Sequence, residues 1–479
     1  MLKILRLLLI VNLTFAYGEL INAEDFNAAG IASAHPLATK AGYEILEQGG
    51  NAFDAAVTVS AVLSVVEPYS SGLGGGGFFL LHSVEKSKSI FIDAREKAPS
   101  MANREMYLDE NGDVLRTASL DGPLASGIPG LPAALYHVSN NHGSIPLYKL
   151  LEPAIRLARD GFPAYERLIT ALTVAERSRT LSPKFKAVFM PNGKLPNIGE
   201  VIKQPELAKT LEIIAASGQE GFYSSFFTET MVEEAREDGS IWLVDDFKNY
   251  SVVEREPITI NFLGAELTTA PPPSSGGTTI ATILNIISEF DFSDMDTSTR
   301  AHLIVEAMRR AYRDRAFYLG DPDFVDIPIG KLISKEHALD LAQTIDMEAA
   351  TPIHKDDQLD GKLAWNEGAH TSHFSILDMN GNRAAVTQTI NTWFGSGYML
   401  PSSGLILNNE MDDFSAKPFA PNRYGLVHGE QNSIQPNKRM LSSMTPTFIE
   451  SDRGLAILGT PGGARIITMV LLSILDYFD

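Results

Sequence analysis

A threonine, Thr371, stands at the head of two alternating, strand-like segments, and a group of amides and carboxylates follows at residues 408–413. The threonine hydroxyl is a candidate nucleophile. The chain contains no cysteine, so thiol nucleophiles, disulfides and cysteine-ligated metals are excluded. Any covalent chemistry of this protein must therefore take place on oxygen or nitrogen.

Thr371 gains a mechanism if the peptide bond between His370 and Thr371 is cleaved. The new α-amine would be held beside the hydroxyl of the same residue, and its ordinary pKa of about 7.7–8.0 suits a general base. One residue would then supply both nucleophile and base. Acidic and polar residues at 355–367 predict an exposed linker just ahead, where the backbone is accessible to cleavage.

Two simpler interpretations of these residues stay open. A threonine within a strand is most often structural, because β-branching fits a pleated surface. His373 alternates with Thr371 on one strand face and could act as a base, although a lone strand histidine is more often packed and hydrogen-bonded. Both interpretations depend on where the two side chains lie in the fold.

Hydrophobic periodicity and turn residues predict a mixed α/β fold. Helices are expected at 36–48, 54–67, 153–160, 204–217, 229–238, 278–289, 300–319 and 466–477. Strands are expected at 78–82, 89–93, 371–378, 383–389 and 454–459. The strands at 371–378 and 383–389 are joined through Asn380-Gly381-Asn382, a strong signal for a hairpin turn.

Other motifs argue against other chemistries. Residues 72–77 fit the glycine spacing of a dinucleotide-binding loop, but a helix precedes them and a strand follows, which is the reverse of the required order. These glycines more simply allow a tight backbone turn packed under a site. The ten histidines show no metal-ligand spacing, and the chain has no G-x-S-x-G nucleophile elbow.

The composition is that of a folded protein with a large core. The 479 residues are 44% hydrophobic and 20% charged, and this length suits two domains or one large layered domain. Lys and Arg number 39 against 59 Asp and Glu, for a formal charge of -20, which repels a polyphosphate backbone. No nucleic-acid partner is expected.

The first residues have the layout of a secretory signal peptide. Lys3 and Arg6 precede an apolar run at 7–15, and small residues follow. The run is shorter than the roughly 20 residues of a spanning helix. Residues 1–23 are therefore predicted to be a signal peptide, and the mature chain is expected to be exported, periplasmic or secreted, without a membrane span. The lack of cysteine favours a bacterial envelope over an animal cell surface.

A series of short motifs follows in order between about Ala34 and Tyr477. They are Gly72 to Gly77, Asp93 to Pro99, Pro271 to Gly277, Thr371 to Phe374, Thr387 to Asn391, Asn408 to Ser415, Pro436 to Arg439, Leu441 to Met444 and Pro461 to Gly463. Together they resemble the γ-glutamyltransferase family, also called glutathione hydrolase. The joint occurrence of these motifs in one order is highly specific.

The resemblance implies an N-terminal nucleophile hydrolase with a four-layer αββα sandwich. Members are made as a precursor that cuts itself before Thr371, which here gives a large subunit of residues 24–370 and a small subunit of residues 371–479 within one domain. The family continues through a further C-terminal segment that supplies core strands. The chain is therefore expected to lack that segment and to expose sheet edges.

The resemblance also implies which residues carry the reaction. Thr371 attacks the γ-glutamyl amide carbon and Thr389 positions it. Backbone N–H groups of Gly462 and Gly463 hold the oxyanion, which a glycine turn can physically offer. Tyr424 resembles the tip of a lid loop over the pocket, so access to the site is expected to be gated.

A second set of residues is implied in binding the free glutamyl head. Its members are Arg95, Ser442 and Ser443 for the α-carboxylate, and Asn391, Glu410 and Asp413 for the α-ammonium group. Arg95 would form a charge-assisted pair with the carboxylate. Each charge of the substrate would then meet its opposite in the site.

The implied activity is hydrolysis and transfer of γ-glutamyl groups. Acylation of Thr371 by glutathione releases cysteinylglycine, and water, an amino acid or a dipeptide then accepts the acyl group. No cofactor or metal is expected. Trp393 is bulkier than the small residue expected at its position and would narrow the acceptor side. Two alternatives stay open, namely a threonine-nucleophile acylase of the cephalosporin acylase kind and an inactive, truncated binding remnant.

Overall fold

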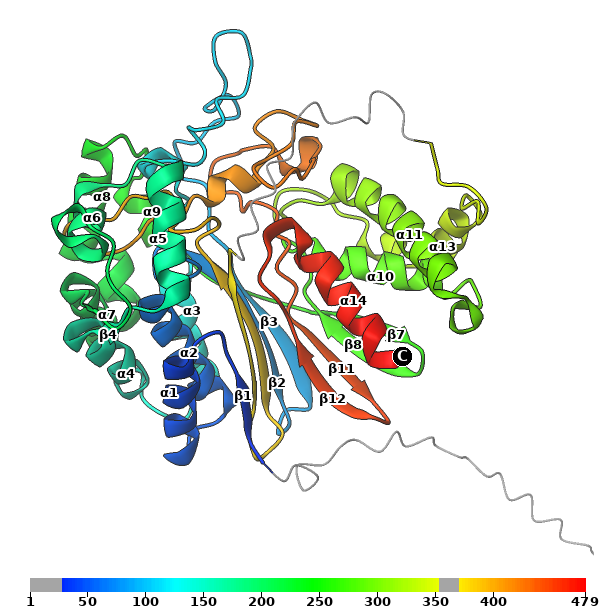
Figure 1. Cartoon of the computed structure of the whole chain (residues 1–479), viewed down its shortest axis with the longest axis horizontal. Coiled ribbons are helices and arrows are strands. Elements are labelled where there is room, and N and C mark those ends of the chain that lie inside the picture. The colour runs from blue at the N-terminus through cyan, green and yellow to red at the C-terminus, as the bar shows by residue number, and fades with distance from the viewer. Residues whose placement is uncertain (1–27, 353–369) are drawn as a thin grey trace, which may run out of the picture.

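The computed structural model describes residues 28–352 and 370–479. The predicted signal peptide, 1–23, and the predicted linker, 355–367, lie outside these residues. Two antiparallel sheets stand side by side at the centre, with helices beyond each of them (Figure 1). The predicted mixed α/β class is confirmed. Within the described part of the chain, no helix is both long and apolar enough to cross a membrane.

The larger sheet has six strands and holds the predicted hairpin. In spatial order the strands are β1 (Gly30–Ala32), β9 (Ser372–Leu377), β10 (Arg383–Thr389), β2 (Gly76–Ser83), β3 (Lys88–Ala94) and β6 (Val253–Arg255). All neighbours are antiparallel. In the β9–β10 hairpin, Ser372 lies opposite Gln388. Thr371 and Thr389 therefore meet at the open end of this hairpin.

The smaller sheet has four strands, of which the sequence predicted only β12, at 454–459. In spatial order they are β12 (Gly454–Leu458), β11 (Thr447–Ser451), β8 (Ala265–Thr269) and β7 (Ile258–Phe262). A two-stranded ribbon pairs β4 (Phe162–Pro163) with β5 (Val201–Ile202). The motif at 461–463 follows β12 directly, so this sheet positions the candidate oxyanion glycines.

The helices form two groups, one beyond each sheet (Figure 1). Beyond the six-stranded sheet lie α1 (Pro36–Glu47), α2 (Ala52–Val66), α3 (Leu131–His142), α4 (Leu147–Asp160), α5 (Glu166–Ser178), α6 (Pro183–Phe189), α7 (Pro205–Tyr223), α8 (Phe226–Glu237) and α9 (Val244–Lys248). Beyond the four-stranded sheet lie α10 (Gly276–Ile287), α11 (Thr297–Tyr318), α12 (Ile329–Leu332), α13 (Lys335–Ala342) and α14 (Ile466–Phe478).

Helix α2 is the central element of the first group, and all its residues are buried. A helix that is apolar on every side must lie in a core. Its first turn is held by a capping box, in which the Asn51 side chain accepts from the N–H of Asp54 and the Asp54 carboxylate accepts from the N–H of Asn51. This cap explains why the helix begins at Ala52, two residues before the predicted start.

Strand β2 separates two hydrophobic cores. Phe79 and Leu81 belong to the core shared with α2, whereas Phe78 and Leu80 belong to the core shared with the four-stranded sheet, α10 and α14. Successive strand residues point to opposite faces, so a strand covered on both sides is apolar throughout. The apolar run predicted as a short strand is therefore the wall between the two halves of the molecule.

Candidate active site

Thr371 lies buried just before β9, with its hydroxyl close to a second threonine. Its Oγ1 is 3.3 Å from the Oγ1 of Thr389, the last residue of β10. The Thr389 hydroxyl also accepts the backbone N–H of Asn391 at 2.8 Å. The backbone of Thr371 has a φ of 144°, a conformation that is strained for a β-branched residue. Thr371 is therefore held out of the strand geometry that a purely structural threonine would adopt.

His370, the residue before Thr371, is packed between two aromatic rings. Its ring centroid lies 5.4 Å from that of Trp393 and 5.9 Å from that of Tyr424. Its Nδ1 accepts the backbone N–H of Trp393 at 3.0 Å. Burial, with a smaller contribution from Arg179, lowers the pKa of His370 to about 3. The imidazole is thus neutral beside the peptide bond that is predicted to be cleaved.

His373 does not lie in a position to act as the base for Thr371. Its ring nitrogens pair with the Thr387 hydroxyl at 2.8 Å and the Ser375 hydroxyl at 3.2 Å. The ring also packs against Gly459, where a Cβ would come within 2.1 Å of it. Burial lowers its pKa to about 3. The structure favours the packed, hydrogen-bonded interpretation of this histidine.

Arg95, just after β3, is completely buried among carboxylates. Its guanidinium pairs with Glu410, with Asp413 at 2.5 Å, and more distantly with Glu96 at 3.6 Å. The same guanidinium donates to the backbone carbonyl of Met440 at 3.1 Å. Three of the predicted substrate-binding residues are therefore brought together, although Arg95 and Glu410 are 315 residues apart in the chain.

The carboxyls around Arg95 exceed the positive charge available to them. Burial raises the pKa of Glu410 well above its ordinary value and that of Glu96 to about 7, although Arg95 opposes both shifts. Burial also raises the pKa of Asp413. One Oε of Glu410 and both of Glu96 have no hydrogen-bond partner among the described residues. These unpaired carboxyl oxygens can accept hydrogen bonds from a cationic group that enters the cluster.

The predicted serine pair lies beside this cluster, on a segment bonded to the Pro271–Gly277 motif. Ser442 donates its backbone N–H to the carbonyl of Pro273 at 2.8 Å, and its own carbonyl accepts from Ser275. The hydroxyl of Ser443 is buried and unpaired within the part of the chain that is described. A free hydroxyl of this kind can donate to an anionic ligand.

Tyr424 is the point at which several of the predicted residues converge. Its hydroxyl donates to the backbone carbonyl of Asn391 at 3.0 Å. Its Cε1 lies 2.6 Å from where a Cβ on Gly463 would be, so only a glycine allows this approach. Asn422, two residues earlier, donates to Asp413 at 3.2 Å. The loop around Tyr424 therefore connects Asn391, the glycine pair and the acidic cluster.

Asn391 and Gly462 are placed by unusual backbone conformations. Asn391 has a φ of 72°, and Gly462 and Gly463 have φ values of 141° and 55°. The side-chain amide of Asn391 donates to the carbonyl of Asn409 at 2.8 Å and does not reach the Arg95 cluster. Its predicted role in holding the substrate ammonium group stays a prediction.

The glycine-rich segment 72–77 packs directly under Thr389. A Cβ on Gly75 would come within 2.0 Å of the Thr389 carbonyl oxygen, and one on Gly74 within 2.0 Å of the Ile406 carbonyl oxygen. Both positions must therefore be glycine for the backbones to approach this closely. The interpretation of this motif as a tight turn below the site is supported by these contacts.

A cavity of about 440 Å³ adjoins Thr371 and is lined by residues of β9 and β12, one strand from each sheet. Residues that line it include Glu67, Ser372, His373, Gly459 and Pro461. Arg95 is not among the residues that line this cavity.

Sequence reasoning missed two residues that contribute to this arrangement. Glu67, at the end of α2, accepts from the Ser372 hydroxyl at 2.6 Å and from the Tyr69 hydroxyl at 2.7 Å. Arg315 of α11 is buried and donates to the Ser275 hydroxyl at 2.9 Å. A glutamate at the end of an apolar helix and an arginine within a charged helix carry no signal that separates them from surface residues.

Protein-family comparison matches residues 38–479 to the model described as "Gamma-glutamyltranspeptidase". The glutathione hydrolase proenzyme of Escherichia coli (strain K12) is 42% identical over 453 residues, covering 94% of this chain and 78% of that protein. The glutathione hydrolase proenzyme of Bacillus subtilis (strain 168) is 36% identical over 470 residues, covering 94% of this chain and 77% of that protein.

Solved structures show the same similarity. Cephalosporin acylase from Bacillus halodurans has a TM-score of 0.81 at 26% identity, over 94% of this chain and 80% of its own. The gamma-glutamyltranspeptidase of Helicobacter pylori has a TM-score of 0.65 at 36% identity, over 69% of this chain and 96% of that chain. The family match spans nearly the whole sequence and includes every motif described above. The chain therefore belongs to the gamma-glutamyltranspeptidase family.

Proposed function

We propose that this protein hydrolyses glutathione and other γ-glutamyl amides and transfers the γ-glutamyl group to amino-acid or dipeptide amines. The observation that carries the proposal is the pairing of the Thr371 and Thr389 hydroxyls at the open end of the β9–β10 hairpin. The glutathione hydrolases that share about two fifths of its sequence support the choice of substrate. No cofactor is needed for the steps that follow.

The first step is maturation of the chain. Cleavage of the bond between His370 and Thr371 leaves a large subunit, 24–370, and a small subunit, 371–479, as a heterodimer within one body. The packing of α2 on one sheet and of α10 and α14 on the other supports an αββα sandwich of the N-terminal nucleophile hydrolase type for this assembly. The mature protein is exported, to a periplasm or to the medium.

The second step is acylation. The free α-amine of Thr371 takes the proton of its own hydroxyl, and Oγ1 attacks the γ-amide carbon of the substrate. Thr389 orients Oγ1 from 3.3 Å, and the N–H groups of Gly462 and Gly463 stabilise the negative oxygen of the tetrahedral intermediate. The amine leaving group takes the proton, and a γ-glutamyl ester remains on Thr371. Water or an acceptor amine then attacks this ester.

The charged cluster recognises the free end of the glutamyl group. Its α-carboxylate binds Arg95 together with Ser442 and Ser443, and its α-ammonium group binds Glu410 and Asp413. In the absence of substrate Arg95 pairs with Glu410 and Asp413, so binding of substrate exchanges partners within the cluster. The loop that carries Tyr424 opens to admit it.

A matched pair of substrates tests this recognition. A γ-glutamyl anilide and a glutaryl anilide differ only in the α-ammonium group. We expect kcat/KM for the glutaryl compound to be lower by about 100-fold or more, because buried carboxyls would be left without their partner. Steady-state kinetics on both compounds provides the measurement. Equal values would instead favour an acylase that does not read the ammonium group.

The binding of free glutamate is expected to weaken as the pH falls. Carboxyls with raised pKa values, such as Glu96 at about 7, are neutral below the pKa and charged above it, so acid removes the negative charge that holds the ammonium group. The inhibition constant of glutamate should rise several-fold from about pH 8 to about pH 6. Glutarate, which has no ammonium group, is the control and should not show this rise. A flat profile for glutamate would contradict the proposed role of the cluster.

A further inference from the structure

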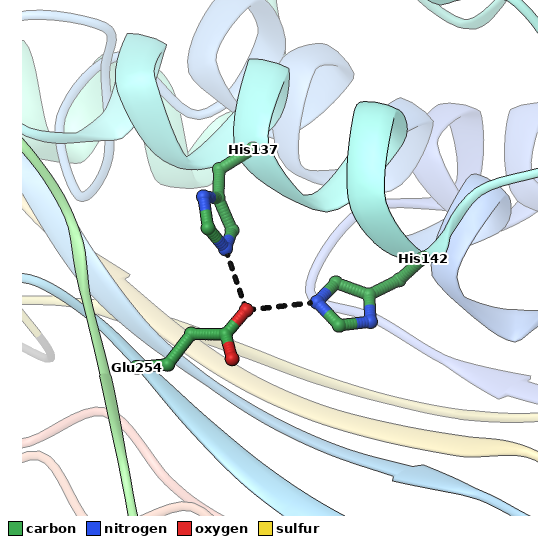
Figure 2. A group of neighbouring side chains, drawn as sticks. All are labelled: His137, His142 and Glu254. Carbon is green, nitrogen blue, oxygen red and sulfur yellow. Dashed lines mark hydrogen bonds and ion pairs between the residues drawn. The ribbon is translucent and has the colours of Figure 1, made fainter. Parts of the chain in front are cut away.

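Two histidines and a glutamate meet on a face of the molecule that the reaction does not use. His137 and His142 lie on the last turns of α3, and Glu254 lies on the edge strand β6 (Figure 2). The Nε2 atoms of both histidines point at one carboxylate oxygen, Oε1 of Glu254, from 2.8 Å and 3.3 Å. None of the three residues lines the cavity beside Thr371.

The spacing of these three atoms matches that of ligands around a small metal ion. Zn²⁺ binds imidazole nitrogen at about 2.0–2.1 Å and carboxylate oxygen at about 2.0–2.2 Å, so tetrahedral ligand atoms lie about 3.3–3.5 Å from one another. Here one ligand atom from each residue lies within 4.8 Å of the others. Small side-chain rotations would bring all three to the distances that a bound ion requires.

We propose that His137, His142 and Glu254 form a binding site for a divalent transition metal, Zn²⁺ in particular, with water at the remaining position. Two imidazoles and one carboxylate are donors that Zn²⁺ accepts readily, whereas Mg²⁺ and Ca²⁺ require oxygen ligands almost throughout. The site would be open to solvent on one side, because the Glu254 side chain is 44% exposed.

The surroundings of the three residues suit ligand roles. The side-chain amide of Asn141 lies 3.2 Å from Nδ1 of His137; turned so that its oxygen accepts the Nδ1–H, it would be the second-shell partner that leaves Nε2 free for the metal. The carbonyl of His142 accepts from Asn51 at 2.8 Å, which fixes the end of α3.

One feature of the surroundings opposes the binding of a cation. Lys86 lies near enough for its charge to act on His142. Its influence is limited, because Lys86 itself is a surface residue and its charge is screened by solvent. Glu254 supplies a compensating carboxylate within the site, 2.8 Å from His137 and 3.3 Å from His142.

A bound ion would join α3 to the edge of the six-stranded sheet. Arg255, the residue after Glu254, pairs with Asp93 at 2.8 Å and with Asp323 at 2.7 Å. Metal binding would add to these ion pairs in holding β6, a strand that is only three residues long and is paired on one side alone.

No short sequence motif contains these ligands, because Glu254 follows His142 after 112 residues.

Titration calorimetry on the purified full chain tests the site. The protein should carry no histidine tag and should first be dialysed against a chelator. We expect one Zn²⁺ per chain to bind with a dissociation constant of about 1 µM or tighter, and Mg²⁺ to give no heat. Tetrahedral Co²⁺ should show its visible absorption bands in the same protein.

Two variants remove ligands and one serves as the control. We expect His137→Ala and Glu254→Gln to weaken Zn²⁺ binding by at least about 10–100-fold, the range seen for loss of even second-shell partners. His302→Ala removes a histidine of α11 whose Nε2 pairs with the Asp346 carbonyl at 2.8 Å, and this variant should bind Zn²⁺ like the parent chain. Glu254→Gln keeps the shape of the side chain, so it decides the matter if His137→Ala does not fold.

Two results would overturn the proposal. One is an absence of saturable Zn²⁺ binding at micromolar concentration, which would leave the three residues as a hydrogen-bonded clamp between α3 and β6. The other is equal Zn²⁺ affinity in the parent chain and both ligand variants. Neither result depends on turnover of γ-glutamyl compounds, so the metal site and the proposed activity stand or fall separately.

Discussion

Replacing Thr371 by alanine is expected to leave the chain as one uncut band and to lower its turnover of γ-glutamyl compounds by at least about 10⁴-fold, as loss of a nucleophile does in other hydrolases. The alanine chain lacks the one hydroxyl that the proposal uses twice, first for self-cleavage of the bond after His370 and then for attack on the substrate. Denaturing gel electrophoresis with N-terminal sequencing and a steady-state assay provide the measurements. In the parent protein, a new chain should begin Thr371-Ser372-His373.

Thr371→Ser is the matched control for this experiment. Serine keeps the hydroxyl and the future α-amine but has no γ-methyl group, so its side chain rotates more freely. We expect cleavage and turnover to persist at a reduced rate. The proposal for Thr371 fails if the alanine variant is still cut at the same bond, or if an uncut parent chain turns over glutathione at full speed.

Replacing Arg95 by lysine is expected to raise KM for γ-glutamyl substrates by about 100-fold. Lysine keeps the positive charge among Glu96, Glu410 and Asp413, so the cluster is not left uncompensated. It cannot, however, present the planar fork that binds a carboxylate through two parallel hydrogen bonds. Initial-rate kinetics across a wide range of substrate concentration separates KM from kcat.

Two observations accompany the Arg95→Lys kinetics. The melting temperature of the variant should stay within a few degrees of the parent value, which shows that the fold is retained. Self-cleavage before Thr371 should also proceed, because Arg95 makes no contact with Thr371. If KM is unchanged while the protein is folded and cut, Arg95 does not bind the substrate carboxylate.

The hairpin that carries Thr371 could be predicted because its signals are local. Alternating residues and the Asn380-Gly381 turn define β9 and β10, and the observed register places Ser372 opposite Gln388. Helices α1 and α2 were likewise predicted from stop signals at glycine and proline. In each case the residues that decide the structure lie within one turn or one strand of each other.

The sequence did not predict strands β7, β8 and β11 of the four-stranded sheet, and the turn between β7 and β8 shows the reason for the first two. Strands β7 and β8 are joined at Leu263 and Gly264, which have φ values of 47° and 82°. Both central residues of such a tight hairpin need a positive φ, a position that favours asparagine, aspartate or glycine. Because leucine stands at the first of these positions, a search by residue type does not find the turn. Strand β7 nevertheless shows the expected alternation, since Ile258, Ile260 and Phe262 are buried and the residues between them are exposed.

The partners of the site residues could not be predicted from local pattern. Arg95 meets Glu410 and Asp413 only because the sheet brings β3 close to the segment after β10. The spacing of these residues along the chain does not indicate that they are neighbours. His373 shows the same limit, since its position on the strand is compatible with a base, but Thr387 and Ser375 occupy its nitrogens. The family resemblance supplied the partners that physical pattern alone did not.

The hydrogen bond between Ser372 and Glu67 has a consequence for the cut chain. Scission before Thr371 would turn a continuous backbone into a loose end, and an amino terminus ordinarily frays. The 2.6 Å bond from Ser372 to Glu67 at the end of α2 anchors that new end one residue beyond the reacting atoms. The new N-terminus would thus be held in place as firmly as a residue inside a strand, and its amine and hydroxyl would keep a fixed position relative to the substrate.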